Sequence, residues 1–289
     1  FTLKVSDPLE SLDGVELESA ALLHIESVAP EITAPRVVQA LDGEWSIFLG
    51  VEDGRYLRLL TYIEGTPLSH VGAPTSTLRS AIGQAVANLD AVLAGFDHPY
   101  ASQRDLIWDV KNLSRLRPHL ALINVHRRPL AEAMLDRFEA VAGPKLAQLP
   151  AQAVHSDMNG QNILVDGERM AGFIDFGDLV HAPRLVDLAG VALLQMHGGE
   201  NDLLDVADIV TAYNEITPLT DLEIELLPEF MIGRCVINVL VTEFLADRAP
   251  ANRTYIMKNN PGSWKRLERL SILSQNPFRS PLQKRRHTP

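Results

Sequence analysis

Apolar and polar residues alternate in several short runs over the first third of the chain. This period of two predicts β-strands over residues 1–6, 36–41, 45–50 and 55–63. Asp-Gly pairs at 42–43 and 53–54 predict turns between the last three of these strands. Residues 15–27 instead carry apolar positions at helical spacing. The pattern therefore predicts a sheet with one helix inserted after its first strand.

The pattern changes to a helical period after the first 64 residues. A helix capped by Ser76 or Thr77 is predicted over residues 76–96, and its apolar face carries Leu78, Ile82, Val86, Leu89 and Leu93. Further helices are predicted over residues 128–143, 186–198, 201–216, 221–247 and 261–273. The sequence therefore predicts an α+β protein with a β-rich lobe at 1–64, a hinge at Glu64–Gly65 and a mainly helical lobe at 65–289.

Two polar motifs interrupt the helical part, and both adjoin runs that are typical of strands. The first, "HSDMNGQNILV", contains His155, Asp157 and Asn162, and the second, "GFIDFGD", contains Asp175. The residues between the motifs form a strand, a "DGER" turn and a returning strand. A hairpin of this length would bring Asp157, Asn162 and Asp175 to one end of a sheet.

These oxygen-bearing side chains are the ones that phosphoryl transfer to a hydroxyl requires. Asp157 can accept the hydroxyl proton, while Asn162 and Asp175 can hold Mg²⁺. His155 is expected to fix the loop through a hydrogen bond to the main chain or to Asp175; a direct chemical role is the alternative. Asp, Asn and Gly also make ordinary turns, but the order of the two motifs and their adjoining strands favour the functional interpretation.

Composition restricts the partners. A hydrophobic content of 46% over 289 residues can bury the core of one large domain or of two lobes. A net charge of -11 disfavours nucleic acid and anionic membranes and would attract a cationic small molecule.

Cys235 is the one cysteine, so neither an internal disulfide nor a cysteine-based zinc site within one chain is available. No apolar run reaches membrane-spanning length and no signal peptide opens the chain, so a cytoplasmic location is expected.

Over almost its whole length the chain resembles the kinase-like small-molecule phosphotransferases, which include aminoglycoside phosphotransferases and choline kinases. The resemblance implies a protein-kinase-like fold of two lobes that uses ATP and Mg²⁺. "FTLKV" resembles the strand whose lysine, here Lys4, pairs with the nucleotide phosphates. "ELESAALLHI" resembles the following helix, whose glutamate partner would be Glu18, with Glu16 as the competing choice. "LTYIEGTPL" resembles the hinge, where the main chain of Tyr62, Ile63 and Glu64 would bind adenine.

A finer resemblance is carried by "IDFGDLVHAPRLVDLA", which is most similar to hydroxylysine kinase and to phosphotransferase domains fused to class III aminotransferases. It implies a hydroxyl acceptor that also carries an amino group, such as hydroxylysine or an amino alcohol; an aminoglycoside and a fused aminotransferase domain stay open. Asp178 and Asp109 are candidate partners for a substrate ammonium, and the alternative is that they cap a turn and a helix. Asp187 is expected to steady the next helix.

The chain departs from this family at its start. It begins inside a strand without Met, where the family has two further strands and a phosphate-covering loop. We therefore expect a fragment of the small lobe. This departure favours one alternative, a non-catalytic nucleotide-binding module of a larger fused protein. A metal-dependent hydrolase that uses His155, Asp157 and Asp175 is a second alternative, but the sequence lacks the several His ligands that such centres use.

Overall fold

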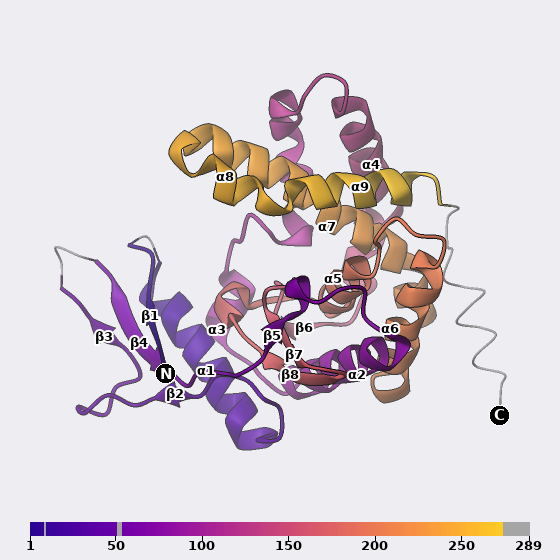
Figure 1. Cartoon of the computed structure of the whole chain (residues 1–289). Helices are drawn as coiled ribbons and strands as arrows, with labels where there is room; N and C mark the ends of the chain where they lie inside the picture. The colour runs from indigo at the N-terminus through magenta and orange to yellow at the C-terminus, as the bar shows by residue number, and fades with distance from the viewer. Residues whose placement is uncertain (9, 51–53, 274–289) are drawn as a thin grey trace.

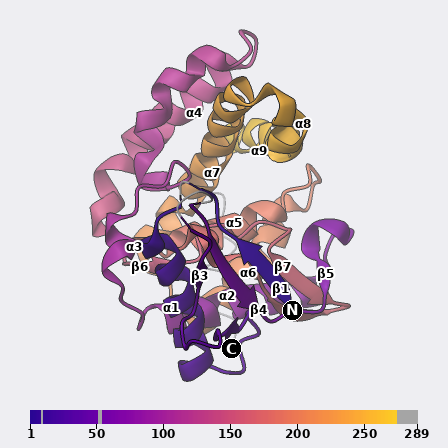
Figure 2. The same cartoon turned by 90° about the vertical axis from the view of Figure 1, so that its left-hand side faces the viewer.

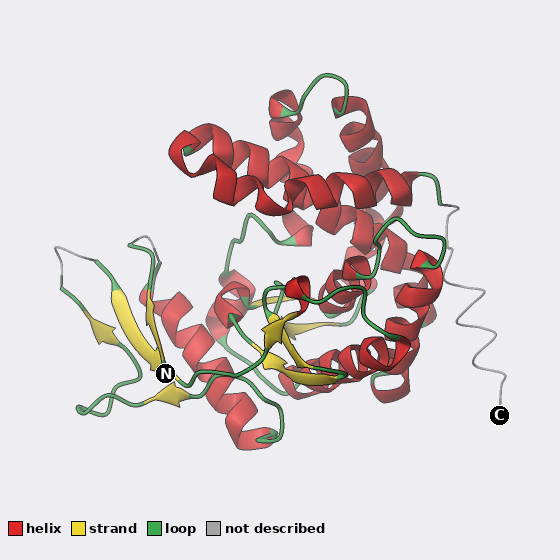
Figure 3. Cartoon of the chain, in the orientation of Figure 1, coloured by secondary structure: helices red, strands yellow, loops and turns green. Residues whose placement is uncertain are grey.

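The computed structural model describes residues 1–8, 10–50 and 54–273. Its strands form one sheet near the N-terminus and smaller sheets inside the helical remainder (Figures 1 and 3). The strands are β1 (Thr2–Val5), β2 (Val37–Val38), β3 (Ile47–Phe48), β4 (Tyr56–Leu60), β5 (Thr66–Pro67), β6 (Ala151–Val154), β7 (Ile163–Asp166), β8 (Arg169–Phe173) and β9 (Val180–Pro183).

Helices make up most of the described chain after residue 75. The α-helices are α1 (Leu12–Val28), α2 (Ser76–Leu93), α3 (Pro99–Gln103), α4 (Arg128–Val141), α5 (Leu185–Leu194), α6 (Asp202–Ile216), α7 (Asp221–Arg248), α8 (Arg253–Ile256) and α9 (Asn260–Ser271). Two 3-10 segments matter below, η2 (Val110–Leu122) and η4 (Phe176–Asp178). Within the described ranges, no helix combines the length and the apolar character needed to cross a membrane.

The N-terminal sheet is built around β4. Strand β1 pairs antiparallel with one edge of β4, and its register places Lys4 opposite Arg58. Helix α1 follows β1, as predicted, and it begins where the Ser11 hydroxyl accepts a hydrogen bond from the Gly14 N–H at 3.2 Å. Figure 2 turns this sheet toward the viewer.

The strands predicted over 36–41 and 45–50 are much shorter in the structure. β2 pairs with Leu60 and Leu59, whereas β3 pairs with Leu57 and Tyr56, so both share one edge of the five-residue β4. That edge offers only about two partners to each strand, which explains their length. An Asp-Gly turn does form at Asp42, whose side chain accepts a hydrogen bond from the Glu44 N–H. The second predicted turn, at 53–54, lies partly outside the described residues, and residues 274–289 lie wholly outside them.

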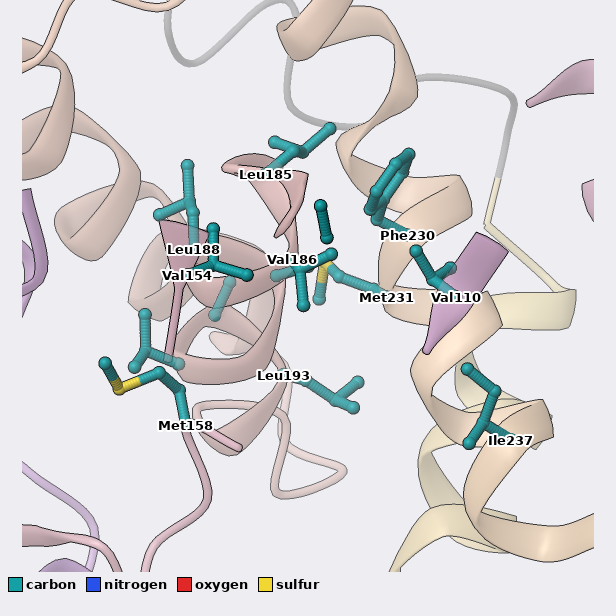
Figure 4. Packing of buried hydrophobic residues seen from close by; sticks show 14 of the residues in the cluster. Val110, Val154, Met158, Leu185, Val186, Leu188, Leu193, Phe230, Met231 and Ile237 are labelled. Atoms are coloured by element: carbon teal, nitrogen blue, oxygen red, sulfur yellow. The ribbon is translucent and has the colours of Figure 1, made fainter. Parts of the chain in front are cut away.

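The remainder of the chain packs helices around the β7–β8 hairpin. α7, of 28 residues, is the central helix, and a capping box of Thr220 and Glu223 starts it. Figure 4 shows side chains of β6, α5 and α7 meeting in the core, among them Val154, Leu188 and Met231, all buried. The chain segment that leaves β6 toward the first polar motif is therefore anchored on a packed core.

Helix α2 differs in detail from its prediction. Its N-cap is Thr75 rather than Ser76 or Thr77, because the Thr75 hydroxyl accepts a hydrogen bond from the Leu78 N–H at 3.2 Å. It ends at Leu93 and packs closely along α6. Residues 97–127, where no strand or helix bounds were predicted, form α3 and η2; the alternative that Asp109 caps a helix agrees with its position as the N-cap of η2.

We predict that Gly83→Ala destabilises the protein. A Cβ at Gly83 would lie 2.4 Å from the main-chain oxygen of Ile209 and 3.1 Å from the Cβ of Ala212, both on α6. Alanine gains up to about 1 kcal/mol of helix propensity, but overpacking costs about 1–3 kcal/mol. Urea unfolding should therefore give a lower free energy of unfolding. Gly72→Ala is the control, since no atom lies within 4 Å of its Cβ position. Equal or greater stability of Gly83→Ala would contradict the close helix contact.

Candidate active site

The β7–β8 hairpin places the two polar motifs at one end of its strands. Asn162 immediately precedes β7 and Asp175 follows β8, and the Ile174 N–H donates to the Asn162 main-chain oxygen at 3.0 Å. The Asn162 side-chain Nδ2 donates to Asp157 Oδ2 at 2.8 Å and to the Asp157 main-chain oxygen at 3.0 Å. Asp157, Asn162, Asp175 and Asp178 line one cavity of about 540 Å³. The hairpin arrangement predicted for Asp157, Asn162 and Asp175 is therefore present.

Buried hydrogen bonds hold the loop before Asp157 in a costly conformation. Ser156 has φ 69°, a left-handed value that costs a non-glycine residue about 1–3 kcal/mol. The wholly buried Asp187 carboxylate accepts the His155 and Ser156 N–H groups at 2.8 Å each. Burial raises the pKa of Asp187, opposed by the His155 imidazole and by these two donors. Asp187 was expected to steady the helix in which it lies, α5. Its carboxylate instead binds the loop at His155 and Ser156.

His155 contacts the main chain through both ring nitrogens. Its Nε2 lies 3.0 Å from the Ile174 oxygen, and its Nδ1 accepts the Asp157 N–H at 3.3 Å. The ring is fully buried and packs on Phe176, with the ring centroids 4.6 Å apart. These contacts match the loop-fixing role that was expected for His155, through the main chain rather than through Asp175. They also leave neither ring nitrogen for a metal, which removes one ligand from the hydrolase alternative.

Lys4 connects the N-terminal sheet to the second motif. Its Nζ lies 2.9 Å from Glu18 Oε1 and 2.9 Å from Asp175 Oδ1. Glu16 is exposed, so Glu18 is the one of the two competing glutamates that contacts the lysine. Burial lowers the pKa of Lys4, but the charges of Glu18 and Asp175 outweigh it and leave the pKa above its ordinary value. Burial raises the pKa of Asp175, but the charge and the hydrogen bond of Lys4 outweigh this effect and leave the pKa below its ordinary value.

Two arginines at the site were missed by the sequence analysis. Arg58 on β4 is buried and its Nη2 lies 2.7 Å from Glu18 Oε2. Arg234 on α7 has its Nη2 3.7 Å from Asp157 Oδ1. The signals were available: Arg58 shares the inward phase of its strand with Leu60, and Arg234 is the only charged residue between Glu229 and Glu243. A cation in an apolar phase needs a buried partner.

The two candidate ammonium partners lie in different places. Asp178 lines the cavity beside Asp157; burial, followed by the negative charge of Asp157, raises the pKa of Asp178. Asp109 does not line that cavity. It is buried as the N-cap of η2, where its Oδ1 accepts the Lys111 N–H at 2.9 Å and its Oδ2 lies 3.1 Å from Lys111 Nζ. The capping alternative therefore describes the contacts of Asp109.

A second cavity, of about 390 Å³, lies between the N-terminal sheet and β7. Leu22, Leu60 and Leu164 contribute apolar walls, and Lys4 and Asp175 close one end. Of the predicted hinge residues, Tyr62 and Ile63 line this cavity and Glu64 does not. Asp175 also lines the 540 Å³ cavity, so it stands where the two cavities meet.

Residues 1–220 match the model of the family described as "Phosphotransferase enzyme family". Hydroxylysine kinase of Mus musculus is 28% identical over 76% of this chain and 61% of its own length. Hydroxylysine kinase of Xenopus laevis is 26% identical over 93% of this chain and 77% of its own length. The match to the Mus musculus relative thus spans less than two thirds of that protein.

The amicoumacin kinase structure solved with AMP-PNP superimposes with a TM-score of 0.64 at 15% sequence identity, covering 90% of this chain and 81% of that one. At this identity the likeness concerns the fold alone. It confirms the predicted α+β architecture, with a small β-rich lobe and a mainly helical remainder. The family match confirms the resemblance that the two motifs indicated.

We predict that Asp178→Asn stabilises the protein at neutral pH. The pKa of Asp178 is raised in the folded state. The wild-type protein therefore keeps its full stability at a pH below the ordinary Asp pKa and loses stability as the pH rises through the raised pKa. Asparagine does not ionise. Urea unfolding should therefore show an advantage for the variant that grows as the pH rises from the ordinary Asp pKa through the raised one. Asp247→Asn, at an exposed position on α7, is the control; a pH-independent difference for Asp178→Asn would contradict the prediction.

Proposed function

Because the chain belongs to the phosphotransferase enzyme family, we propose that it transfers the γ-phosphate of ATP to a hydroxyl group of a small molecule. The observation that carries the proposal is the position of Asp175. It lines both cavities and pairs with Lys4 at their junction. A phosphate tail that leaves the smaller cavity would pass Lys4 and Asp175 before it reached Asp157. That order is the one that in-line transfer requires.

The smaller cavity is proposed to bind the nucleotide. Its leucine walls suit the flat apolar faces of adenine, and Lys4 suits the α- and β-phosphates. The main-chain N–H groups of Ile63 and Glu64 donate to no described residue, which supports a role for them in binding the adenine edge. We propose residues 1–64 as a nucleotide-binding lobe and 65–289 as a catalytic and acceptor-binding lobe, with Lys4 oriented by Glu18.

The donor atoms near Asp175 fit Mg²⁺, which commonly takes one or two carboxylates and completes its shell with phosphate oxygens and water. The Asn162 amide nitrogen is used by Asp157, so its Oδ1 is the atom left to face a cation. Lys4 contacts only Oδ1 of Asp175, which leaves Oδ2. A bound Mg²⁺ would neutralise the charge that develops between the β- and γ-phosphates. Asn162 and Asp175 are the residues proposed to hold it.

Asp157 is proposed to receive the acceptor proton. Its Oδ2 accepts hydrogen bonds from Asn159 Nδ2 and Asn162 Nδ2, both at 2.8 Å. Its Oδ1 accepts no hydrogen bond from a described residue and lies 3.7 Å from Arg234 Nη2, and the Asp157 side chain lines the 540 Å³ cavity. The acceptor oxygen would form a bond to the γ-phosphorus while the bond from phosphorus to the β,γ-bridging oxygen breaks. The hydroxyl proton passes to Asp157 and ADP leaves.

The acceptor is proposed to carry an amino group beside its hydroxyl, as hydroxylysine and amino alcohols do. Asp178 next to Asp157 supports an ammonium site, as do the net charge of -11 and the similarity to two hydroxylysine kinases. An aminoglycoside is the other acceptor class considered. The cytoplasmic location and a fused aminotransferase domain stay predictions from the sequence.

We predict that Asp157→Asn lowers kcat by about a hundredfold or more, the scale of a lost general base. The affinity for ATP, measured by calorimetry, should stay within about threefold of wild type, because Asp157 does not line the nucleotide cavity. Asp166→Asn, in the exposed β7–β8 turn, is the matched control. Turnover of Asp157→Asn equal to that of wild type would remove Asp157 from the chemistry. Tight nucleotide binding by wild type without any transfer would favour the non-catalytic module.

Asp175→Ala is expected to abolish Mg²⁺-dependent nucleotide binding or turnover, because it removes the carboxylate that stands between the two cavities. The measurement is a titration of ATP at several Mg²⁺ concentrations for wild type and variant. Asp166→Asn again controls for loss of a carboxylate elsewhere on the hairpin. An unchanged Mg²⁺ dependence in Asp175→Ala would take this residue out of the metal site.

A further inference from the structure

A third cavity, of about 530 Å³, adjoins the proposed acceptor cavity behind the loop that follows Asp157. The two cavities have a common wall, formed by Asn159, Gln161, Arg234, Asn238, Lys258 and Asn259. A molecule with its hydroxyl at Asp157 could therefore extend along this wall into the third cavity, which is called the basic cavity below.

The two cavities differ in their carboxylates. The acceptor cavity is lined by Asp157, Asp175 and Asp178, together with Arg234 and Lys258 of the common wall. The basic cavity is lined by His197, Arg234, Lys258 and Arg266, and none of its described lining residues is an Asp or Glu. In a chain with a net charge of -11, a pocket with cationic side chains and no carboxylate is a specific local arrangement rather than a reflection of composition.

Lys258 and Arg266 differ from Arg234, whose Nη2 lies 3.7 Å from Asp157 Oδ1. Among the described residues, no carboxylate oxygen lies within 4 Å of Lys258 Nζ or of the Arg266 guanidinium. Arg266 makes one hydrogen bond, from its Nε to the Met196 main-chain oxygen at 3.3 Å. Burial lowers the pKa of Arg266, which means that its positive charge lacks full compensation. An anionic group from outside the chain would supply that compensation.

Gln195 provides an independent sign that a ligand binds in the basic cavity. Its side chain is 1% exposed, and its Nε2 donates to the Val191 main-chain oxygen at 3.2 Å. Its Oε1 is buried and accepts no hydrogen bond from a described residue, although the side chain lines the cavity. A buried acceptor without a donor costs about 1–3 kcal/mol, so a ligand that brings a donor there is favoured.

We propose that the acceptor is a hydroxy amino acid whose carboxylate is bound in the basic cavity by Arg234, Lys258 and Arg266. The inference rests on the proposed function and specifies its substrate class. The hydroxyl lies at Asp157, and the α-ammonium, next to the carboxylate, donates to Gln195 Oε1. Any further ammonium of the acceptor would lie at Asp178. Simple amino alcohols and aminoglycosides have no carboxylate and leave the basic cavity without its anion.

Matched pairs of acceptors test this assignment. In each pair the second compound is the first without its carboxylate: 5-hydroxylysine with 1,5-diaminopentan-2-ol, and homoserine with 3-aminopropan-1-ol. Hydrogen bonds to charged groups contribute about 1.5–3 kcal/mol, so kcat/KM for the amino acid of the preferred pair should exceed that of its partner by about 10- to 100-fold. The difference should lie mainly in KM, because the carboxylate is remote from the transferred phosphate.

Variants of the basic cavity locate the effect. Lys258→Met and Arg266→Gln should each bring the ratio of kcat/KM within the preferred pair toward one, by raising KM for the amino acid. Lys258 is exposed, so its substitution does not threaten the fold. Lys265→Gln, an exposed neighbour of Arg266 that lines neither cavity, is the control and should keep the wild-type ratio. ATP affinity of each variant reports whether the protein is intact.

The outcomes separate the inference from the proposed function. Transfer to an amine with kcat/KM equal to or above that of the corresponding amino acid would overturn the inference and leave the kinase activity standing. The same holds for a preference for the amino acid that Lys258→Met and Arg266→Gln leave unchanged. Nucleotide binding without transfer to any of the four compounds or to an aminoglycoside would overturn both.

Discussion

The geometry of the site depends on one buried carboxylate. Asp187 has no exposure to water and receives the two main-chain N–H groups that lead into Asp157. Burying a charge costs several kcal/mol unless hydrogen bonds compensate it, and these two bonds do so while they fix the left-handed turn at Ser156. Burial, and then the charge of Asp187, raise the pKa of nearby Asp90.

Hydrogen bonds and ion pairs connect the loop held by Asp187 to the rest of the site. His155 joins the loop to Ile174, the residue before Asp175, and Asn162 joins Asp157 to the start of β7. Asp175 then meets Lys4, which Glu18 and Arg58 hold from the N-terminal sheet. A continuous series of hydrogen bonds and ion pairs therefore links a buried helix to the outer sheet. Each of these side chains has a partner inside the protein, and Lys4, Asp157, Asn162 and Asp175 also line the cavities.

Much of this could be predicted from the sequence, because the residues concerned are close together in it. The two motifs and the turn between them determine a hairpin, and a hairpin determines which side chains share an end. Lys4 and Glu18 required the family resemblance, since alone each reads as a surface residue. The isolated charge of Arg234 in an apolar run indicates that it needs a partner, but the sequence does not identify that partner. Asp157 is 77 positions away, and only the packing of α7 brings the two side chains together. For Asp109 the sequence left two roles open, because an Asp that caps a helix and an Asp that binds a substrate have the same local pattern. The structure shows the capping contact.

The strand predictions show a second limit. Alternation identified β2 and β3, but their length depends on how much of the β4 edge is available, which is a property of the assembled sheet. Similarly, the basic cavity draws its residues from segments between residues 68 and 266, which no local pattern connects.

The most direct test of the account is to incubate the protein with Mg²⁺, ATP and each acceptor, and to follow ADP and phosphorylated acceptor together. Both products should form in equal amounts, only when a hydroxyl acceptor is present, and Asp157→Asn should form neither at a comparable rate. Phosphate release without an acceptor, or nucleotide binding without any transfer, would contradict it.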